Sequence, residues 1–227
     1  MTVASRILRK AAAARGYACE KGSFRGNVCR ASRDGGEFVL KLLFPFQRRG
    51  YLTERRVYKK LPSWWPVRLE EAFELEGNHV VVTTYFPSVD WVTSSAGAAA
   101  IVRDICRQLD WLHANGIRHN DPLLKNVLVG RNGRAAVIDF EKSRFVKSAA
   151  SGTAGPLDVM GLVGDVASRK APSRLMKAVA RALLDRFFEY PGAERAIRGL
   201  RARFPGYLES VAASGVGSAR SSERLRE

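Results

Sequence analysis

Cysteine, histidine and methionine are scarce in this 227-residue sequence, with three of each. The cysteines Cys19, Cys29 and Cys106 are odd in number and share no metal-ligand spacing, so neither a disulfide framework nor a zinc cluster is expected. No apolar run approaches the roughly 20 residues that span a bilayer, which argues against a transmembrane segment. A reduced, cytoplasmic protein is the resulting expectation.

Acidic residues are few relative to basic ones, at 22 against 38, and the formal net charge is +16. This excess predicts attraction to polyanions such as nucleic acid, an anionic membrane surface or an acidic substrate. A merely solubilising surface is the alternative, and charge alone does not decide between them. The length accommodates one domain or two small lobes with an adequate core.

The N-terminal stretch before Glu20 is rich in arginine and alanine and has no acidic residue, as in a transit peptide. The interpretation preferred here is a short helix over 5–15, because alanine favours helix. Such a helix would pack Val3, Ile7 and Leu8 against the body of the protein. We therefore treat residues 1–19 as a helical extension.

Three polar residues, His119, Asp121 and Asn126, lie in a loop that follows an expected long helix. A hairpin of two short apolar strands comes next, about a turn at 131–133, and ends at Asp139. Two carboxylates and a carboxamide thus lie at the ends of one hairpin. Oxygen ligands of this kind suit Mg²⁺. The carboxylate left over could orient a substrate hydroxyl, as phosphoryl transfer requires.

A glycine-containing turn precedes the first long strand. Gly22 and Gly26 flank Phe24, which we expect to be exposed, and Val28 begins the returning strand. Glycine lets backbone amides approach phosphate groups closely, because no Cβ intervenes. Such turns are also common hairpin connections, so this signal is weak alone.

One lysine, Lys41, lies within an apolar strand over 38–43, and its burial would be costly without a partner. The helix expected over 50–61 has Glu54 on its apolar face, and a buried carboxylate needs a cation. The sequence therefore predicts a Lys41–Glu54 ion pair. The alternative is an edge-strand lysine that reaches solvent.

The opposite face of the same helix is basic. It could bind an acidic or nucleic-acid partner, or it could be a solvated face, and the sequence leaves both open. The residues are Arg48, Arg49, Arg55, Arg56, Lys59 and Lys60.

The remaining pattern alternates short strands with amphipathic helices. His113, near the end of the long helix, has no evident partner and is interpreted as structural. The Ser-, Gly- and Arg-rich C-terminus predicts disorder. Strands are expected over 67–75 and 80–85, helices over 96–115, 173–189 and 193–204, and a disordered tail over 211–227.

These motifs, in this order, resemble those of protein kinases. His119-x-Asp121-x4-Asn126 is similar to the catalytic loop H-R-D-x4-N, and the segment 139–141, Asp-Phe-Glu, is similar to D-F-G. Lys41 resembles the strand lysine of V-A-I-K. The turn described above resembles the glycine-rich loop, with one glycine fewer.

The resemblance covers about residues 20–205. It is to small atypical kinase-like enzymes: RIO-type kinases, the minimal kinase of the tRNA-modifying KEOPS complex and lipopolysaccharide-core kinases. It implies an α+β, two-lobed, protein-kinase-like fold, with a small antiparallel sheet in the N-lobe (20–86) and a truncated, mostly helical C-lobe (87–210).

The resemblance also implies γ-phosphoryl transfer from ATP with Mg²⁺. Asp121 would be the base that orients the acceptor hydroxyl, Asn126 and Asp139 would hold Mg²⁺, and Lys41, held by Glu54, would contact the α- and β-phosphates. Lys41 and Asn126 join Asp121 as the implied catalytic set, and His119 would pack the loop. The implied nucleotide-covering residues are Gly22, Ser23, Phe24, Gly26 and Val28.

Some positions depart from the kinase pattern. Leu123 stands where Ser/Thr kinases place a loop lysine, and Lys125 offers a similar charge two residues later. Glu141 replaces the glycine of D-F-G. This replacement argues against ordinary activation-loop switching. The segment 142–156 is short and has no A-P-E motif. Asp158, after it, resembles the helix-start aspartate that ties down the catalytic loop.

The favoured interpretation is an atypical serine/threonine protein kinase. The alternatives are a kinase of a sugar, lipopolysaccharide-core or small-molecule hydroxyl, and a catalytically inactive pseudokinase scaffold. A nucleic-acid-binding module would explain the charge but not the four polar residues Lys41, Asp121, Asn126 and Asp139 together.

Overall fold

The computed structural model describes residues 2–91, 97–146 and 154–226. It divides into two compact units: unit 1 is Met1–Phe86 with Asp139–Lys142, and unit 2 is Pro87–Ile138 with Ser143–Glu227. Unit 1 holds a small antiparallel sheet and unit 2 is mostly helical, which confirms the expected α+β class. Each unit is described in turn.

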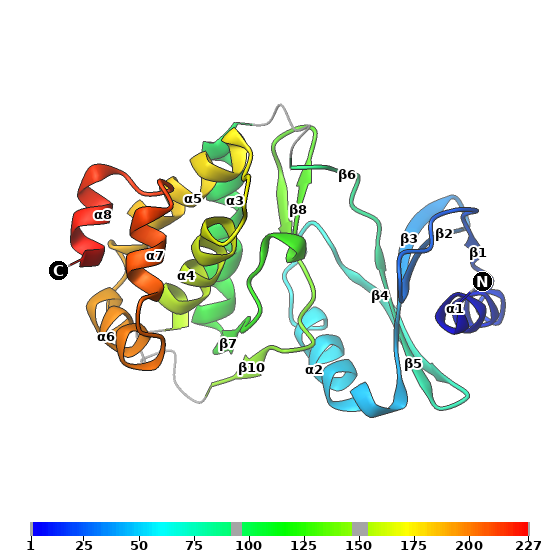
Figure 1. Ribbon diagram of the computed structural model, residues 1–227. Helices are drawn as coiled ribbons and strands as arrows, with labels where there is room; N and C mark the ends of the chain where they lie inside the picture. The colour runs from blue at the N-terminus through cyan, green and yellow to red at the C-terminus, as the bar shows by residue number, and fades with distance from the viewer. Residues whose placement is uncertain (1, 92–96, 147–153, 227) are drawn as a thin grey trace. The chain divides into compact units, whose positions relative to one another are not determined.

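Unit 1 is built on a five-stranded antiparallel sheet of order β1-β2-β3-β5-β4 (Figure 1). The turn between β2 and β3 has positive φ at Asp34 (51°) and Gly35 (77°), a conformation that aspartate tolerates and glycine favours. The strands are β1 Ala18–Cys19, β2 Val28–Arg33, β3 Gly36–Leu43, β4 Leu69–Leu75 and β5 Asn78–Thr84.

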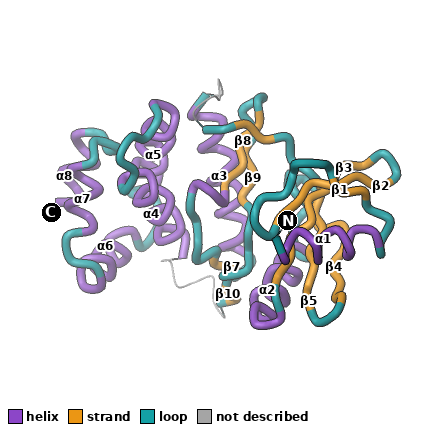
Figure 2. Tube along the Cα trace, turned by 45° about the vertical axis from the view of Figure 1, so that its right-hand side comes forward, coloured by secondary structure: helices purple, strands orange, loops and turns teal. Residues whose placement is uncertain are grey.

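The two faces of this sheet have different partners because side chains alternate along each strand. Leu40 and Leu42 of β3, with Val80 and Val82 of β5, point into the core that α1 (Val3–Ala13) closes (Figure 2). The odd-numbered side chains of β3 point to the other face. Lys41 is therefore directed toward α2 (Arg48–Tyr58).

Helix α1 is an integral part of unit 1 rather than an extension. Leu8, Ala11 and Ala12 are buried in the sheet core, and Ile7 packs against it, as expected. Val3, by contrast, is 59 % exposed, so its predicted packing is wrong. Val3 is the first residue of the helix, and the buried residues of α1 begin only at Ser5.

Helix α2 follows the 3₁₀ turn η1 (Pro45–Gln47) and buries Tyr51, Glu54, Val57 and Tyr58. The short segment Asp139–Lys142 completes this side of unit 1. Its Phe140 is fully buried, with its ring 5.1 Å from that of Tyr58 and 6.1 Å from that of Trp65. Aromatic burial thus fixes the residues on either side of Phe140.

Unit 2 is formed by helices with two small sheets, β6-β8-β9 and β7-β10. Helix α5 packs on both α3 and α4 (Figure 1). The elements of unit 2 are β6 Ser88–Val89, α3 Ala98–Ala114, β7 Ile117–Arg118, η2 Leu124–Asn126, β8 Val127–Gly130, β9 Ala135–Val137, β10 Arg144–Phe145, α4 Ala154–Ala167, α5 Arg174–Phe187, α6 Ala193–Arg203, α7 Tyr207–Ala213 and α8 Ala219–Arg226.

Helix α3 supports the hairpin β8–β9 through buried hydrogen bonds as well as its apolar stripe. The Gln108 side chain donates to the Ala135 carbonyl (2.8 Å) and accepts from the Val137 N–H (2.9 Å). The Asp104 carboxylate accepts from the Ala135 N–H at 3.0 Å. These bonds satisfy backbone groups that would otherwise be buried unpaired. Ala96, the expected start of this helix, lies outside the described residues.

The C-terminal segment is helical, which corrects the disordered tail expected over 211–227. Ser218 and Ser221 of this segment hydrogen-bond Asp185 of α5. Leu225 is fully buried, and its carbonyl accepts from the Arg201 guanidinium at 2.7 Å. The polar composition concealed several buried apolar side chains, Val211, Val216 and Leu225 among them, and a serine cap.

Among the described residues, no helix combines the length and apolar character needed to cross a bilayer.

The position of Leu8 gives a test of the role of α1. Leu8→Ala removes a fully buried side chain and should lower the free energy of unfolding by about 2–5 kcal/mol, because a cavity remains. Val3→Ala, on an exposed side chain of the same helix, is the matched control and should change it by less than about 0.5 kcal/mol. Urea unfolding of both variants measures this. Equal, small effects would mean that α1 is only an appendage.

Candidate active site

Lys41 is the centre of a charged cluster in unit 1. Its Nζ lies 3.0 Å from Glu54 Oε2, 2.6 Å from Asp139 Oδ1 and 3.3 Å from Glu141 Oε2. The lysine side chain is 16 % exposed and that of Glu54 only 2 %. The predicted Lys41–Glu54 pair is therefore present, and two further carboxylates join it.

Strand register and helix periodicity bring this pair together. In the sheet, Lys41 is paired with Val28 of β2 on one side and Val81 of β5 on the other, so two valines flank its stem. Glu54 lies one turn after Tyr51 on the inward face of α2. Each charge thus occupies a position where the local pattern calls for an apolar side chain.

Burial and charge act in opposite directions on the two partners. Burial lowers the pKa of Lys41, but Glu54, Asp139 and Glu141 outweigh it, and the lysine pKa is raised above its ordinary value. Burial raises the pKa of Glu54 to about 7, although Lys41 partly offsets this. Three carboxyl groups around one ammonium leave an excess of negative charge.

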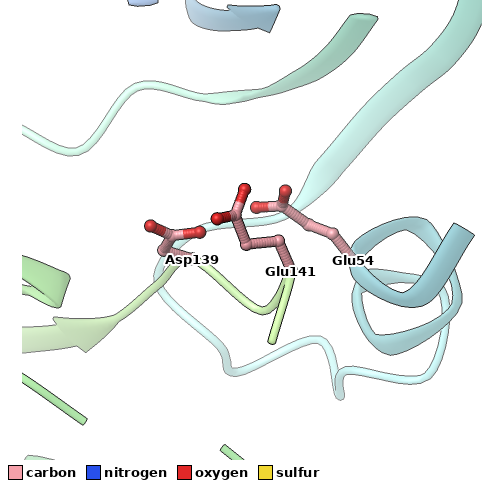
Figure 3. Close-up of side chains that lie close together, drawn as sticks. All are labelled: Glu54, Asp139 and Glu141. Atoms are coloured by element: carbon pink, nitrogen blue, oxygen red, sulfur yellow. The ribbon is translucent and has the colours of Figure 1, made fainter. Parts of the chain in front are cut away.

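This excess suits a cation. Glu54, Asp139 and Glu141 each offer an oxygen, and these oxygens lie within 4.8 Å of one another. Figure 3 shows the three carboxylates directed toward one another, Glu54 from α2 and the other two from the segment after β9. Hard oxygen donors of this kind fit Mg²⁺.

The backbone at Asp139 adopts a left-handed conformation, with φ +68°. Such a φ is uncommon outside glycine and costs of the order of 1 kcal/mol or more unless the surroundings impose it. Burial of Phe140 supplies that constraint, because it fixes the chain directly after Asp139. The strain therefore serves to aim the Asp139 carboxylate at Lys41.

Glu141 is the residue of this cluster that sequence reasoning missed. Its Cβ lies close to Gly50 of α2, where a Cβ would approach it to 3.2 Å. The absence of a side chain at Gly50 makes room for Glu141 next to the helix. The only available signal was its position two residues after Asp139, which we treated as a departure from the kinase pattern.

Unit 2 holds the second group of predicted residues, His119, Asp121 and Asn126. The buried Asp158 carboxylate of α4 accepts hydrogen bonds from the backbone N–H groups of His119 (2.9 Å) and Asn120 (3.1 Å). Asn120 itself has φ +67°. Asp158 thereby ties down the start of this loop, as the resemblance implied.

His113 has a partner that was not evident from the sequence, and the contact fits the structural role expected for it. Its Nε2 lies 2.8 Å from Asp158 Oδ2, so α3 helps to hold the same carboxylate. Burial raises the Asp158 pKa, but the hydrogen bond from His113 and the charges of both His113 and His119 outweigh it, and the pKa is lowered. The separation of 45 positions in the sequence explains why sequence analysis did not reveal this contact.

Asp121 and Asn126 are joined directly. The Asn126 side-chain amide donates to the Asp121 carbonyl at 2.8 Å and to its carboxylate at 3.3 Å. Lys125 Nζ lies 4.0 Å from the Asp121 carboxylate, so it supplies a positive charge there although Leu123 occupies the usual kinase position. The fully buried His119 ring places Nε2 3.0 Å from the Ile138 carbonyl, which fits a packing role.

The glycine-containing turn lies in unit 1, between β1 and β2. Gly22 and Gly26 have φ values of 82° and 59°, and a Cβ at either would meet nothing within 4 Å. The Ser23 hydroxyl is bonded to both the Glu20 and Arg30 carbonyls, at 2.8 and 3.1 Å. The serine hydroxyl is therefore used to shape the turn.

Phe24 is not exposed as expected. It is half-buried against the α1 side of the sheet, with the Arg9 guanidinium 4.9 Å above its ring. The prediction is wrong because α1 provides a cation–π partner that the turn alone does not reveal. The backbone of this turn, rather than the phenyl ring, remains the candidate phosphate contact.

The structure thus groups Lys41, Glu54 and Asp139 in unit 1 and His119, Asp121 and Asn126 in unit 2. Their predicted roles in catalysis stay predictions.

Residues 78–151 match the model of a known family, the lipopolysaccharide kinase (Kdo/WaaP) family. The matched segment is about a third of the chain and includes Asp121, Asn126 and Asp139. It confirms the expected resemblance to atypical kinase-like families, of which lipopolysaccharide-core kinases were one. The match supports a kinase. A search of curated proteins found no match.

The raised pKa of Glu54 gives a pH test of the cluster. The folded state binds the Glu54 proton more tightly than the unfolded chain, so the resulting stabilisation is present below pH 4.5 and is lost as pH rises through about 7. Glu54→Gln mimics the protonated carboxyl. The wild-type free energy of unfolding, minus that of the variant, should therefore fall by something on the order of 1–3 kcal/mol across this range.

Urea unfolding at several pH values measures this difference. Glu209→Gln, at an exposed position, is the control and should show no such trend. A pH-independent difference for Glu54→Gln would contradict the assigned pKa.

Proposed function

We propose that this protein is an ATP- and Mg²⁺-dependent phosphotransferase whose acceptor is a hydroxyl group of a lipopolysaccharide-core saccharide. The observation that carries the proposal is the buried Lys41 held by Glu54 beside the strained Asp139. A fixed ammonium of this kind is the phosphate ligand of kinase-like enzymes. The family match over 78–151 favours the saccharide acceptor.

On the donor side, Lys41 would bind the α- and β-phosphate oxygens of ATP, with Glu54 keeping its ammonium in place. Asp139 would hold Mg²⁺ together with Asn126, and Glu141 adds a further carboxylate oxygen next to Asp139. The metal supplies neutralisation of the phosphate charge when it is bound. The backbone amides between Gly22 and Gly26 would cover the phosphates.

On the acceptor side, Asp121 would accept a hydrogen bond from the acceptor hydroxyl and orient its oxygen toward the γ-phosphorus. A bond forms between that oxygen and phosphorus as the bond to the β–γ bridging oxygen breaks. The hydroxyl proton passes to Asp121 and ADP leaves. Asn126, which donates to the Asp121 carboxylate, keeps it in one orientation.

A serine or threonine hydroxyl of a protein is the second candidate acceptor. The observation that favours it is Lys125, whose ammonium lies 4.0 Å from the Asp121 carboxylate and could replace the loop lysine of Ser/Thr kinases. RIO-type kinases, which the sequence motifs resemble, would be the corresponding family for this version. A pseudokinase is less well supported, because Lys41, Asp121, Asn126 and Asp139 all retain the required side chains.

We also propose that the reaction takes place in the cytoplasm. Its use of ATP favours this location, and so do the three cysteines, all of which are free thiols.

Asp121→Asn tests the acceptor side. It should leave ATP binding within about twofold but reduce transfer at least about 100-fold, because the amide cannot accept the proton. Transfer is measured with γ-labelled ATP and either a core oligosaccharide or a pool of Ser/Thr peptides. Asp34→Asn, at an exposed turn where asparagine tolerates positive φ, is the control and should keep full activity. Near-normal transfer by Asp121→Asn would contradict the role of Asp121 as the base. If the wild type labels the peptides but not the oligosaccharide, a protein serine or threonine is the acceptor.

Asp139→Ala tests the donor side. It should weaken binding of ATP in the presence of Mg²⁺ far more than binding of metal-free ATP, because its proposed task is coordination. Calorimetric titration with and without Mg²⁺ provides both affinities. If the ATP affinity fell equally with and without Mg²⁺, the role of Asp139 would be limited to holding Lys41 in place.

A further inference from the structure

The outer face of α2 is a continuous basic strip. Arg48, Leu52, Arg55 and Lys59 follow one another at spacings of four, three and four residues, which places them in one row along the helix. Arg49, Arg56 and Lys60 form the neighbouring row. We refer to these seven residues, with Phe46 just before the helix, as the outer face of α2.

The charge of this face is not compensated within α2. Glu54 is the only acidic residue of the helix, and it is buried on the opposite side against Lys41. Arg48, Arg49 and Lys59 are exposed and form no ion pair with any of the residues that the structure describes. At least three cations therefore point to solvent together, where an anionic surface would be complementary.

Two large apolar side chains belong to the same stretch of the chain, Phe46 just before α2 and Leu52 within it. Phe46 is 84 % exposed and Leu52 is 44 % exposed, and only Val3 and Phe204 are comparable among the described hydrophobic residues. The Phe46 ring stacks on Phe44, with centroids 5.8 Å apart, so a neighbouring aromatic supports it at the surface. Single exposed apolar residues are ordinary, but here two lie within one basic segment.

We infer that the outer face of α2 docks on an anionic lipid surface. Both features interact favourably with such a surface. The headgroups attract the arginines and lysines, while Phe46 and Leu52 enter the boundary between headgroups and acyl chains. The aliphatic stems of the basic side chains can follow the same boundary. A nucleic acid would attract the basic side chains, but it offers no comparable apolar region for Leu52.

The docking would be peripheral and reversible. The helix has 11 residues, which is about 16 Å of length, and it keeps its inward face in the core of unit 1. Because Glu54 lies on that inward face, the lipid contact leaves the Lys41 cluster in place. The inference therefore does not rest on the proposed chemistry and can fail or succeed separately from it.

The experiment is co-sedimentation of the full chain with phosphatidylcholine vesicles that contain about 30 % phosphatidylglycerol, at about 0.1 M salt. One variant combines Phe46→Ser with Leu52→Ser, and another combines Arg48→Gln, Arg49→Gln and Lys59→Gln. Both should bind at least about fivefold more weakly than the wild type. The control combines Arg195→Gln, Arg203→Gln and Arg220→Gln, three exposed arginines of unit 2, and should change binding less than about twofold although it removes equal charge.

Circular dichroism of each variant verifies folding, and transfer to a soluble acceptor monitors the chemistry independently. Equal losses in the α2 charge variant and the unit 2 control would mean that net charge alone acts, which overturns the inference. An unchanged affinity of the Phe46/Leu52 variant would also overturn it. If the wild type binds single-stranded RNA but not the vesicles, the basic face is a nucleic-acid surface instead.

Discussion

A single buried ammonium organises unit 1. Removing a lysine charge from water is costly, and the three carboxylates around Lys41 offset that cost from two different parts of the chain. Glu54 comes from α2, while Asp139 and Glu141 come from a segment nearly one hundred residues after Lys41. The Lys41 charge that would contact phosphate in the proposed reaction is thus the same charge that holds β3, α2 and the segment 139–142 together.

The Asp158 carboxylate plays the corresponding part in unit 2. It accepts two backbone N–H groups of the loop and contacts the ring of His113 on α3. One buried anion thereby connects α3, α4 and the residues before Asp121. Both units use a charge that is largely removed from solvent and bonded to polar partners to fix a loop whose backbone includes a residue at positive φ.

Much of this could be predicted where local periodicity is sufficient. Strand alternation and helix spacing placed Lys41 and Glu54 on facing surfaces, and the ordered loop motifs identified Asp121, Asn126 and Asp139 as candidates. The failures share a different cause. The partner of His113, the cover over Phe24 and the place of Glu141 each depend on an element distant in sequence, and no local pattern encodes such contacts. The C-terminal helix was missed because one buried Leu225 outweighs a polar composition.

The placement of residues 139–142 has a consequence for how the protein is made. Ile138 and Ser143 belong to unit 2, yet the four residues between them belong to unit 1. Residues 1–86 alone lack Phe140 and two of the three carboxylates around Lys41. Unit 1 therefore cannot complete its core during synthesis until more than half of the chain has left the ribosome, although domains otherwise tend to fold from the N-terminus as they emerge. A fragment ending at the first boundary would be an incomplete folding unit, and any separation of the two units for independent expression would have to re-supply this peptide.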